Sequence, residues 1–206
     1  MSNPVFWDKA AEKYAKSPIK DMKAYEDTLV RARHYLREDD HLLEVGCGTG
    51  TTALKLAPFV GRITATDISG EMIGIAKRKQ KDAGIGNVTF LTSEIMQPLA
   101  EAPFDAVFAS SILHLVDDLD ATLAHLFAQV KPGGLVFTKT ACLKNMSRLI
   151  PPMIKVMQFF GKAPHVLHFS TDELEAAFRK AGFRVTETGH FGKNRYTHFV
   201  VAQRPA

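Results

Sequence analysis

The sequence predicts one α/β domain of the doubly wound class, in which helices cover both faces of a parallel sheet. Short apolar runs alternate along the chain with segments of helical periodicity. The run Leu42–Val45 is followed by glycines at alternate positions, Gly46, Gly48 and Gly50, and then by a segment with a helical pattern. A second apolar run ends in Asp67, about 20 residues after the first glycine, which is the spacing typical of nucleotide sites in this class.

Two helices are expected before the first strand. The first lies within residues 1–20, where apolar side chains recur at helical spacing, namely Trp7, Ala10, Ala11, Tyr14 and Ala15. Ser17 and Pro18 end this pattern. The second is expected over 21–37, with one apolar stripe formed by Tyr25, Leu29, Ala32 and Leu36. Its Arg-rich and Lys-rich face is expected to lie in solvent.

The central part of the chain predicts the alternating sheet. Strands are expected over 41–46, 62–67, 88–91, 104–109 and 135–139. Helices are expected over 51–58, from the cap residue Ser69 to Gly84, and over 119–130. Residues 131–134, Lys-Pro-Gly-Gly, are typical of a turn. This order favours parallel pairing with right-handed crossovers.

The last third has a different pattern. Residues 148–160 are apolar almost all round, which is typical of a helix that is buried or that covers an apolar ligand. Ser170 and Glu173 form a capping box, and Gly182 is placed to end the helix that follows. Two final strands are expected near 183–190 and 196–203.

Composition excludes several classes. The 206 residues are 46% hydrophobic and 23% charged, an ordinary globular balance for a single domain. The net charge of +4 is mild and no dense basic block is present, so no nucleic-acid partner is expected. No apolar run approaches the roughly 20 residues of a membrane span, and the N-terminal residues do not resemble a secretory signal, so a cytoplasmic location without stable membrane insertion is expected.

The glycine-rich stretch identifies a family resemblance. Glu44, Gly46, Gly48 and Gly50 match E/D-x-G-x-G-x-G, and Thr51 stands where the dinucleotide fingerprint G-x-G-x-x-G would place its third glycine. This stretch resembles the signature of class I S-adenosylmethionine (SAM)-dependent methyltransferases. Three further segments are similar to that family: the pattern around Phe6-Trp7-Asp8, the Lys-Pro-Gly-Gly turn, and the last helix with its closing strand pair.

The resemblance implies the architecture of the chain. It implies a Rossmann-like, seven-stranded, mostly parallel sheet with an antiparallel last strand and helices on both faces, formed by residues 1–206 as one domain. Residues 1–37 would form N-terminal cap helices over the cofactor pocket. Residues 144–168 would form a helical insertion that covers the substrate, although packing in a homodimer interface is an open alternative for its apolar segment.

The resemblance also implies a site for SAM and its product S-adenosylhomocysteine (SAH). Glu44 and the turn containing Gly46, Cys47, Gly48 and Gly50 would hold the methionine part. Asp67 would bind the ribose hydroxyls, which a carboxylate suits because it accepts two charge-assisted hydrogen bonds. Ile68 and Met72 would flank the adenine, and Ser110 would lie under the sulfonium. Glu94 and Ile95 would lie at the edge of the adenine, where the family usually has an acid, and Ser93 is the alternative residue for that position.

Methyl transfer needs a base only when the acceptor must lose a proton. His114 is the first candidate because it follows the fourth strand, His165 and His168 are weaker ones, and Tyr14 is expected to close over the cofactor. Carboxylates and histidines lack ligand spacing, so no metal is expected. The expected partner is a small apolar or aromatic acceptor.

Two other functions stay open. A non-catalytic SAM-binding protein would keep the same pocket without turnover. A nicotinamide-dependent oxidoreductase would use a similar glycine turn, but it predicts a third glycine at the position of Thr51 and a hydride-transfer set that the sequence does not contain.

Overall fold

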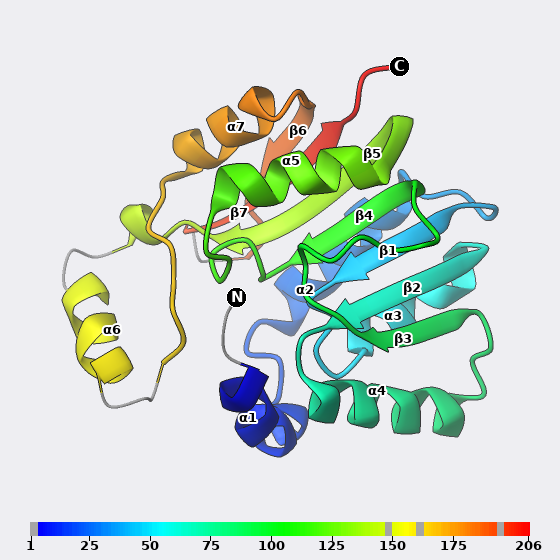
Figure 1. Cartoon of the computed structure of the whole chain (residues 1–206), viewed down its shortest axis with the longest axis horizontal. Coiled ribbons are helices and arrows are strands. Elements are labelled where there is room, and N and C mark those ends of the chain that lie inside the picture. Colours follow the sequence, from blue (N-terminus) through cyan, green and yellow to red (C-terminus); the bar gives the residue numbers. More distant parts are fainter. Residues whose placement is uncertain (1–3, 147–149, 160–162, 193–195) are drawn as a thin grey trace.

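The computed structural model describes residues 4–146, 150–159, 163–192 and 196–206. Within them, seven strands form one sheet in the order β3-β2-β1-β4-β5-β7-β6 (Figure 1). The strands are β1 His41–Val45, β2 Arg62–Asp67, β3 Val88–Thr92, β4 Phe104–Ser110, β5 Val130–Ala141, β6 Arg184–Gly189 and β7 Thr197–Gln203. Strands β1 to β5 pair in parallel, and β7 is antiparallel to both β5 and β6. The predicted fold class is therefore confirmed.

Helices cover both faces of the sheet. The helices are α1 Pro4–Lys16, α2 Met22–Arg33, α3 Thr51–Leu56, α4 Gly70–Ala83, α5 Leu119–Gln129, α6 Ile150–Phe159 and α7 Thr171–Lys180, with short 3₁₀ turns at Ala57–Phe59 and Leu143–Asn145. Side chains of α5 and α7 pack on one face, and side chains of α2, α3 and α4 pack on the other. The two-residue period of β1 explains this: Leu42 faces the second layer and Leu43 faces the first.

One prediction about local structure is wrong. Residues 131–134 belong to β5 rather than to a free turn. The N–H of Gly133 donates to the carbonyl of Arg204 over 2.9 Å, and the N–H of Arg204 donates to the carbonyl of Gly134 over 2.9 Å. This pairing with the segment after β7 extends the strand through the two glycines, and sequence periodicity cannot show it.

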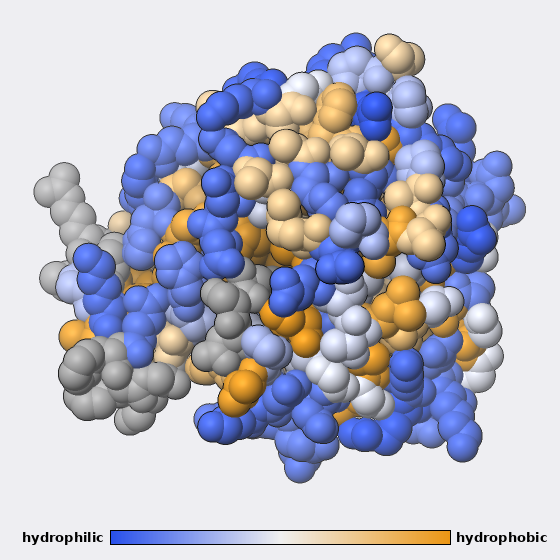
Figure 2. All heavy atoms as spheres, viewed as in Figure 1, coloured by the Kyte–Doolittle hydropathy of each residue, from blue (hydrophilic) through white to orange (hydrophobic). Residues whose placement is uncertain are grey.

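The strand order reverses between β1 and β4, where the chain leaves the sheet in opposite directions. In doubly wound folds, a crevice at such a switch point is the usual ligand position. Figure 1 shows α1 and α6 near this carboxyl-end edge of the parallel strands. Figure 2, drawn from the same direction as Figure 1, shows hydrophilic side chains around much of the outline and hydrophobic side chains between them.

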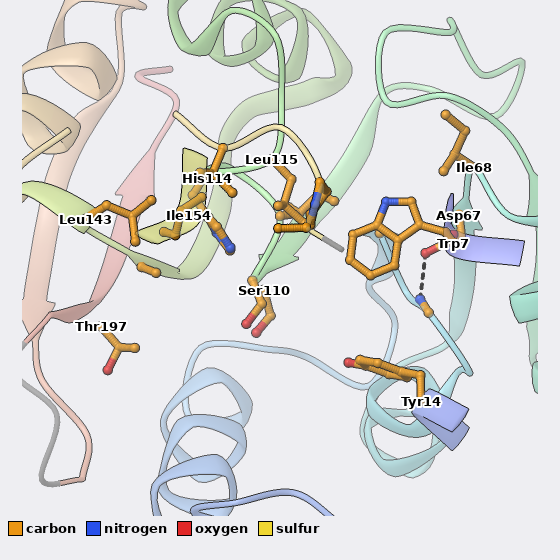
Figure 3. Close-up of a pocket in the computed structure, with 18 of the residues that line it drawn as sticks. Trp7, Tyr14, Asp67, Ile68, Ser110, His114, Leu115, Leu143, Ile154 and Thr197 are labelled. Atoms are coloured by element: carbon orange, nitrogen blue, oxygen red, sulfur yellow. Dashed lines mark hydrogen bonds between the residues drawn. The ribbon is translucent and has the colours of Figure 1, made fainter. Parts of the chain in front are cut away.

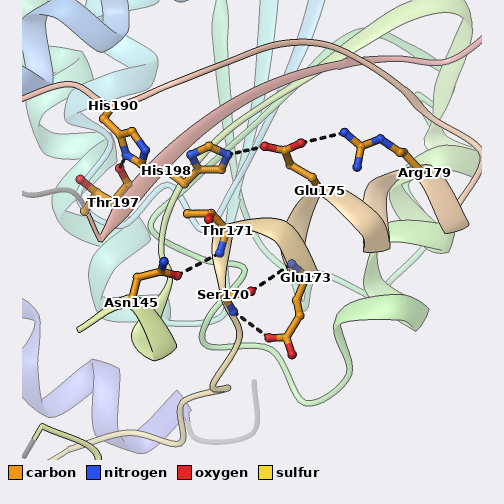
Figure 4. A network of polar contacts seen from close by, with 9 residues as sticks. All are labelled: Asn145, Ser170, Thr171, Glu173, Glu175, Arg179, His190, Thr197 and His198. Carbon is orange, nitrogen blue, oxygen red and sulfur yellow. Dashed lines mark hydrogen bonds and ion pairs between the residues drawn. The ribbon is translucent and has the colours of Figure 1, made fainter. Parts of the chain in front are cut away.

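The insertion that carries α6 is attached at one end to the start of α7 and at the other end to the loop after β4. The side-chain oxygen of Asn145 accepts a hydrogen bond from the N–H of Thr171 over 3.0 Å, next to the capping box of Ser170 and Glu173 (Figure 4). The N–H of Leu167 donates to the carbonyl of His114 over 2.8 Å. These contacts fix where the insertion leaves and rejoins the fold.

Candidate functional site

Three glycines after β1 form the turn at the switch point. Gly46, Gly48 and Gly50 have φ angles of 67°, 53° and 75°, which favour glycine. A Cβ on Gly46 would lie 2.6 Å from Cδ1 of Ile112, and one on Gly50 would lie 2.7 Å from Cβ of Ala76. A Cβ on Gly48 would meet only Cε1 of Tyr14, at 3.7 Å. Gly46 and Gly50 therefore permit close packing of the protein, whereas Gly48 leaves space for a ligand.

Glu44 brings a buried carboxyl group to this turn. The residue is 3% exposed, and its Oε2 has no hydrogen-bond partner within the described part of the chain. Burial raises the pKa of this carboxyl from 4.5 to about 8; the N–H of Ala53 opposes the shift, and the charge of Asp67 adds to it. A buried carboxyl oxygen without a partner is costly, so this position favours a cationic ligand group.

Asp67 ends β2 and holds the turn. Its Oδ2 accepts from the N–H of Gly48 over 2.8 Å (Figure 3). Its Oδ1 accepts from the N–H of Ser69 over 2.9 Å. Burial raises the pKa of the Asp67 carboxyl, while these two N–H donors oppose the shift. Each carboxylate oxygen keeps a further lone pair for a ligand hydroxyl.

Helix α1 covers the cavity and is attached to α4 by a polar contact. Asp8 Oδ1 accepts from the Ser69 hydroxyl over 2.6 Å, and Ala11 packs against Met72. This attachment places Trp7 and Tyr14 in the cavity wall. Tyr14 is 55% exposed, yet the protein around its hydroxyl and the charges of Asp67 and Glu44 raise the pKa of its phenol.

Two adjoining cavities meet at the glycine turn. One has a volume of about 520 Å³, the other about 550 Å³, and both are lined by Tyr14, Gly46, Gly48, Ser110 and Ser111. The second cavity also contains Glu44 and Cys47, and burial raises the pKa of the Cys47 thiol. Together they form a continuous site with a polar end and an apolar end.

The apolar end lies between the loop after β4 and the insertion that carries α6. Its wall includes Leu115, Leu143, Ile154, Met157 and Val166. Figure 3 shows Leu143 and Ile154 on the side of the cavity opposite Trp7 and Tyr14. Because these side chains come from the insertion and its neighbours, the insertion forms one wall of the site.

The loop after β4 has a strained backbone. Ser111 has a φ of 56°, unusual for a residue other than glycine, and its N–H donates to the carbonyl of Lys139 over 2.7 Å. Such conformations cluster at functional sites. Ser110 and Ser111 both line the cavity at the point where its polar and apolar ends meet.

His114 follows in the same loop and is half-buried. Its Nδ1 lies 3.0 Å from the Thr140 hydroxyl oxygen. Burial lowers the pKa of the imidazole to about 4, so the ring is neutral at neutral pH. A neutral imidazole with this pKa is a weak base, but it can donate or accept one hydrogen bond at each nitrogen.

Most of the residues predicted from the sequence lie together. Those that line the two cavities are Tyr14, Glu44, Gly46, Cys47, Gly48, Asp67, Ile68, Met72, Ser110 and His114. Gly50 is the N-cap residue before α3 and packs closely against Ala76 and Phe90 behind the turn. Glu94 is exposed and Ile95 packs in the core, and neither lines these cavities. Their assignment to the adenine edge stays a prediction without support from this geometry.

Sequence reasoning missed several lining residues. Tyr196 and Thr197 line the apolar end because the antiparallel β7 starts at the edge where the parallel strands finish. Thr140 contacts His114 because Thr140 lies at the carboxyl end of β5 and His114 follows the carboxyl end of the neighbouring strand β4. The position of strand ends was available from the sequence, but the pairing of β7 with β5 was not.

The described residues contain neither a candidate metal cluster nor a candidate membrane span. No group of three or more His, Cys, Asp or Glu side chains among them could hold a metal ion. None of the helices in these ranges has the length and apolar character that crossing a membrane requires.

Comparison with known proteins identifies relatives. A family model described as a methyltransferase domain matches residues 16–188. The demethylmenaquinone methyltransferase of Lactococcus lactis is 30% identical over 191 residues, covering 80% of this chain and 74% of that protein. The O-methyltransferase resE of Aspergillus sclerotiorum is 30% identical over 161 residues, covering 77% of this chain and 60% of that protein.

A solved structure shows the same fold. The N-methyltransferase NodS from Bradyrhizobium japonicum, in complex with SAH, superimposes with a TM-score of 0.70 at 15% identity, covering 97% of this chain and 99% of that chain. Several curated relatives are longer proteins: this chain spans 47%, 60%, 56% and 42% of the length of four of them.

Proposed function

Because the chain belongs to the class I SAM-dependent methyltransferase family, we propose that it transfers a methyl group from SAM to a small, apolar or aromatic acceptor. The observation that carries the proposal is the buried Oε2 of Glu44, which lacks a partner in the described ranges and lies beside a glycine turn open at Gly48. SAM supplies the ammonium group that such a carboxylate requires.

The lining residues offer a place for the methionine part, the ribose and the faces of the adenine. Glu44 would bind the ammonium, and the small size of Gly48 would let the methionine part approach the turn. Asp67 would accept hydrogen bonds from the ribose hydroxyls, and the apolar side chains of Ile68 and Met72 would flank the adenine. This arrangement leaves the sulfonium near Ser110, where the polar and apolar ends meet.

The bound cofactor supplies a methyl group on a positively charged sulfur, already activated for in-line displacement. The protein then contributes alignment and exclusion of water. Trp7 and Tyr14 close one side through α1, and Ile154 and Met157 close the other through α6. We expect His114 and Tyr14 to contact the acceptor or the cofactor as neutral groups, because burial lowers the pKa of the first and raises that of the second.

The lining of the apolar end supports an apolar or aromatic acceptor. Leu115, Leu143, Ile154, Met157 and Val166 offer hydrophobic contacts and little charge. The relatives named above methylate different acceptors, so the acceptor atom is not assigned. We propose that residues 144–168 act as a substrate lid. A homodimer interface is the competing role for the outer side of α6, where Met153 and Val156 are exposed.

The test begins with ligand binding to the purified chain. Titration calorimetry should give saturable binding of SAH and SAM and no binding of NADH. A binding result for NADH alone would overturn the proposal in favour of the oxidoreductase. Transfer of tritium from methyl-labelled SAM to a panel of phenols and quinols should follow; binding of SAM without transfer to any acceptor would favour the non-catalytic SAM-binding protein.

A further inference from the structure

A buried threonine fixes the orientation of the histidine in the cavity wall. Thr140 is 1% exposed, and its hydroxyl oxygen lies 3.0 Å from Nδ1 of His114. Figure 3 shows the His114 ring directed into the cavity, between Ile154 and Ser110. His114 lines the cavity, and the described ranges contain no hydrogen bond to its Nε2. Nε2 is nevertheless not one of the fully buried atoms without a partner. This nitrogen therefore has accessible surface in the cavity.

We propose that Thr140 donates its hydroxyl hydrogen to Nδ1 of His114, that His114 thereby presents Nε2–H to the cavity, and that this donor selects acceptors carrying an oxyanion, such as a phenolate or an enolate. The second half of the proposal rests on the proposed function, because it names the class of acceptor for that same site. The first half concerns the protein alone.

The hydrogen-bond inventory of Thr140 favours this tautomer. A threonine hydroxyl has one hydrogen to donate, and His114 Nδ1 is the partner found for it among the described residues. If Nδ1 carried the proton and donated to Thr140, the buried hydroxyl hydrogen would have no acceptor there. A buried donor without an acceptor costs about as much as a lost hydrogen bond. The tautomer with the proton on Nε2 satisfies both groups.

The ring also stays neutral, so it offers one proton to the cavity and keeps it. Burial lowers the pKa of His114 to about 4, and its Nδ1 lone pair is occupied by Thr140. The ring therefore has no free basic nitrogen for a proton taken from the acceptor. An acceptor that arrives as an oxyanion needs no such step, and Nε2–H can hold its oxygen while a second lone pair, or the conjugated carbon of an enolate, faces the methyl group.

The reaction then balances without a base. One bond forms between the methyl carbon and the acceptor oxygen or carbon, and the sulfur–methyl bond breaks with its electron pair moving to sulfur. The negative charge of the acceptor and the positive charge of the sulfonium disappear together. No proton is transferred to the protein.

Nitrogen-15 NMR of the imidazole rings tests the tautomer in the free protein. Wild type and His114→Leu are compared at pH 7 to identify the His114 signals among the eight histidines. We expect a neutral ring with hydrogen on Nε2, the same state in Thr140→Ser, and a mixture of tautomers in Thr140→Val. A ring protonated on Nδ1 or on both nitrogens in wild type would overturn the proposal, as would an unchanged tautomer in Thr140→Val.

Binding of 4-nitrophenol tests the selectivity, because its phenol and phenolate forms differ in absorbance. With SAH present, wild type and Thr140→Ser should prefer the phenolate about tenfold more strongly than His114→Leu does, as expected for one hydrogen bond to a charged oxygen. Equal preference in wild type and His114→Leu would refute the selectivity. Failure of SAH to bind would reject the proposed function instead, while the tautomer result would stand.

Discussion

Replacing Glu44 with Gln tests the charge of the carboxyl group at the centre of the site. The ordinary pKa of 4.5 becomes about 8 in the fold, mainly through burial, and each pKa unit corresponds to about 1.4 kcal/mol. Ionisation of Glu44 should therefore lower the free energy of unfolding of the ligand-free protein by roughly 3 kcal/mol at pH 7 and roughly 5 kcal/mol at pH 9.

The sign follows from the protonation of the two states. Below pH 4.5 the Glu44 carboxyl is protonated in both the folded and the unfolded chain, and it contributes no penalty. As the pH rises, the unfolded chain loses this proton first, so the folded chain becomes less stable until the folded pKa of about 8 is passed. Gln keeps the shape of Glu, and its oxygen can still accept from the N–H of Ala53, but it does not titrate.

Urea unfolding at pH 5, 7 and 9 measures the effect. Glu44→Gln should match wild type within about 1 kcal/mol at pH 5 and exceed its free energy of unfolding by roughly 5 kcal/mol at pH 9. The matched control is Glu38→Gln, because Glu38 is exposed and should show no such divergence. A difference between Glu44→Gln and wild type that stays constant from pH 5 to 9 would refute the inference that Glu44 is protonated in the free fold.

The same group should couple cofactor binding to proton release. At pH 7 a carboxyl with a pKa of about 8 is mostly protonated, and binding an ammonium requires the carboxylate. Calorimetry of SAH in buffers of different ionisation enthalpy should therefore show release of about 0.9 proton per site in wild type and none attributable to this position in Glu44→Gln. Equal proton release in both proteins would separate Glu44 from the ammonium.

Further substitutions test the other parts of the site. Asp67→Ala should weaken SAH binding about tenfold or more in calorimetry, since it removes a charged acceptor of hydrogen bonds from the ribose hydroxyls. Asp82 is exposed, and Asp82→Ala should bind SAH like wild type. Equal SAH affinities of the two variants would remove Asp67 from the site. Gly50→Ala should lower the free energy of unfolding by about 2 kcal/mol more than Gly84→Ala does. Both glycines have a positive φ, but only at position 50 would the added Cβ press against Ala76 and Phe90. Equal losses of stability in the two variants would show that the packing around position 50 relaxes. Met157→Ala should raise the KM for an apolar acceptor, since Met157 lines the cavity. Val156→Ala, at a position that is 58% exposed, should leave this KM unchanged. If Val156→Ala converts a dimer to a monomer and neither variant changes the KM, α6 belongs to an interface instead.

The end of the site that we propose for the cofactor could be predicted from the sequence because its residues are close together in the chain. Glu44 and the glycines lie on one strand and its turn, and Asp67 ends the neighbouring strand. Parallel pairing of β1 with β2 then brings these groups to one edge of the sheet. Local patterns and one pairing rule were sufficient.

The acceptor end could not be predicted in the same way because its residues come from elements far apart in the chain. His114 meets Thr140 only because β4 pairs with β5, and Tyr196 joins them only because β7 inserts antiparallel beside β5. Helical periodicity predicted α6 but not the side of it that faces the cavity, because the segment is apolar all round. Pairing across the sheet decides these positions.

This difference separates cofactor recognition from acceptor recognition within the fold. The groups around Glu44 and Asp67 lie at the ends of strands that are paired within the central sheet. The insertion is attached at Asn145 and Leu167, on either side of α6, and Ile154 and Met157 of α6 line the cavity. Under the proposed function, substitutions in α6 should therefore change which acceptor fits without moving the glycine turn, whereas the N–H donor proposed at His114 depends on β4 and β5 and should stay in place.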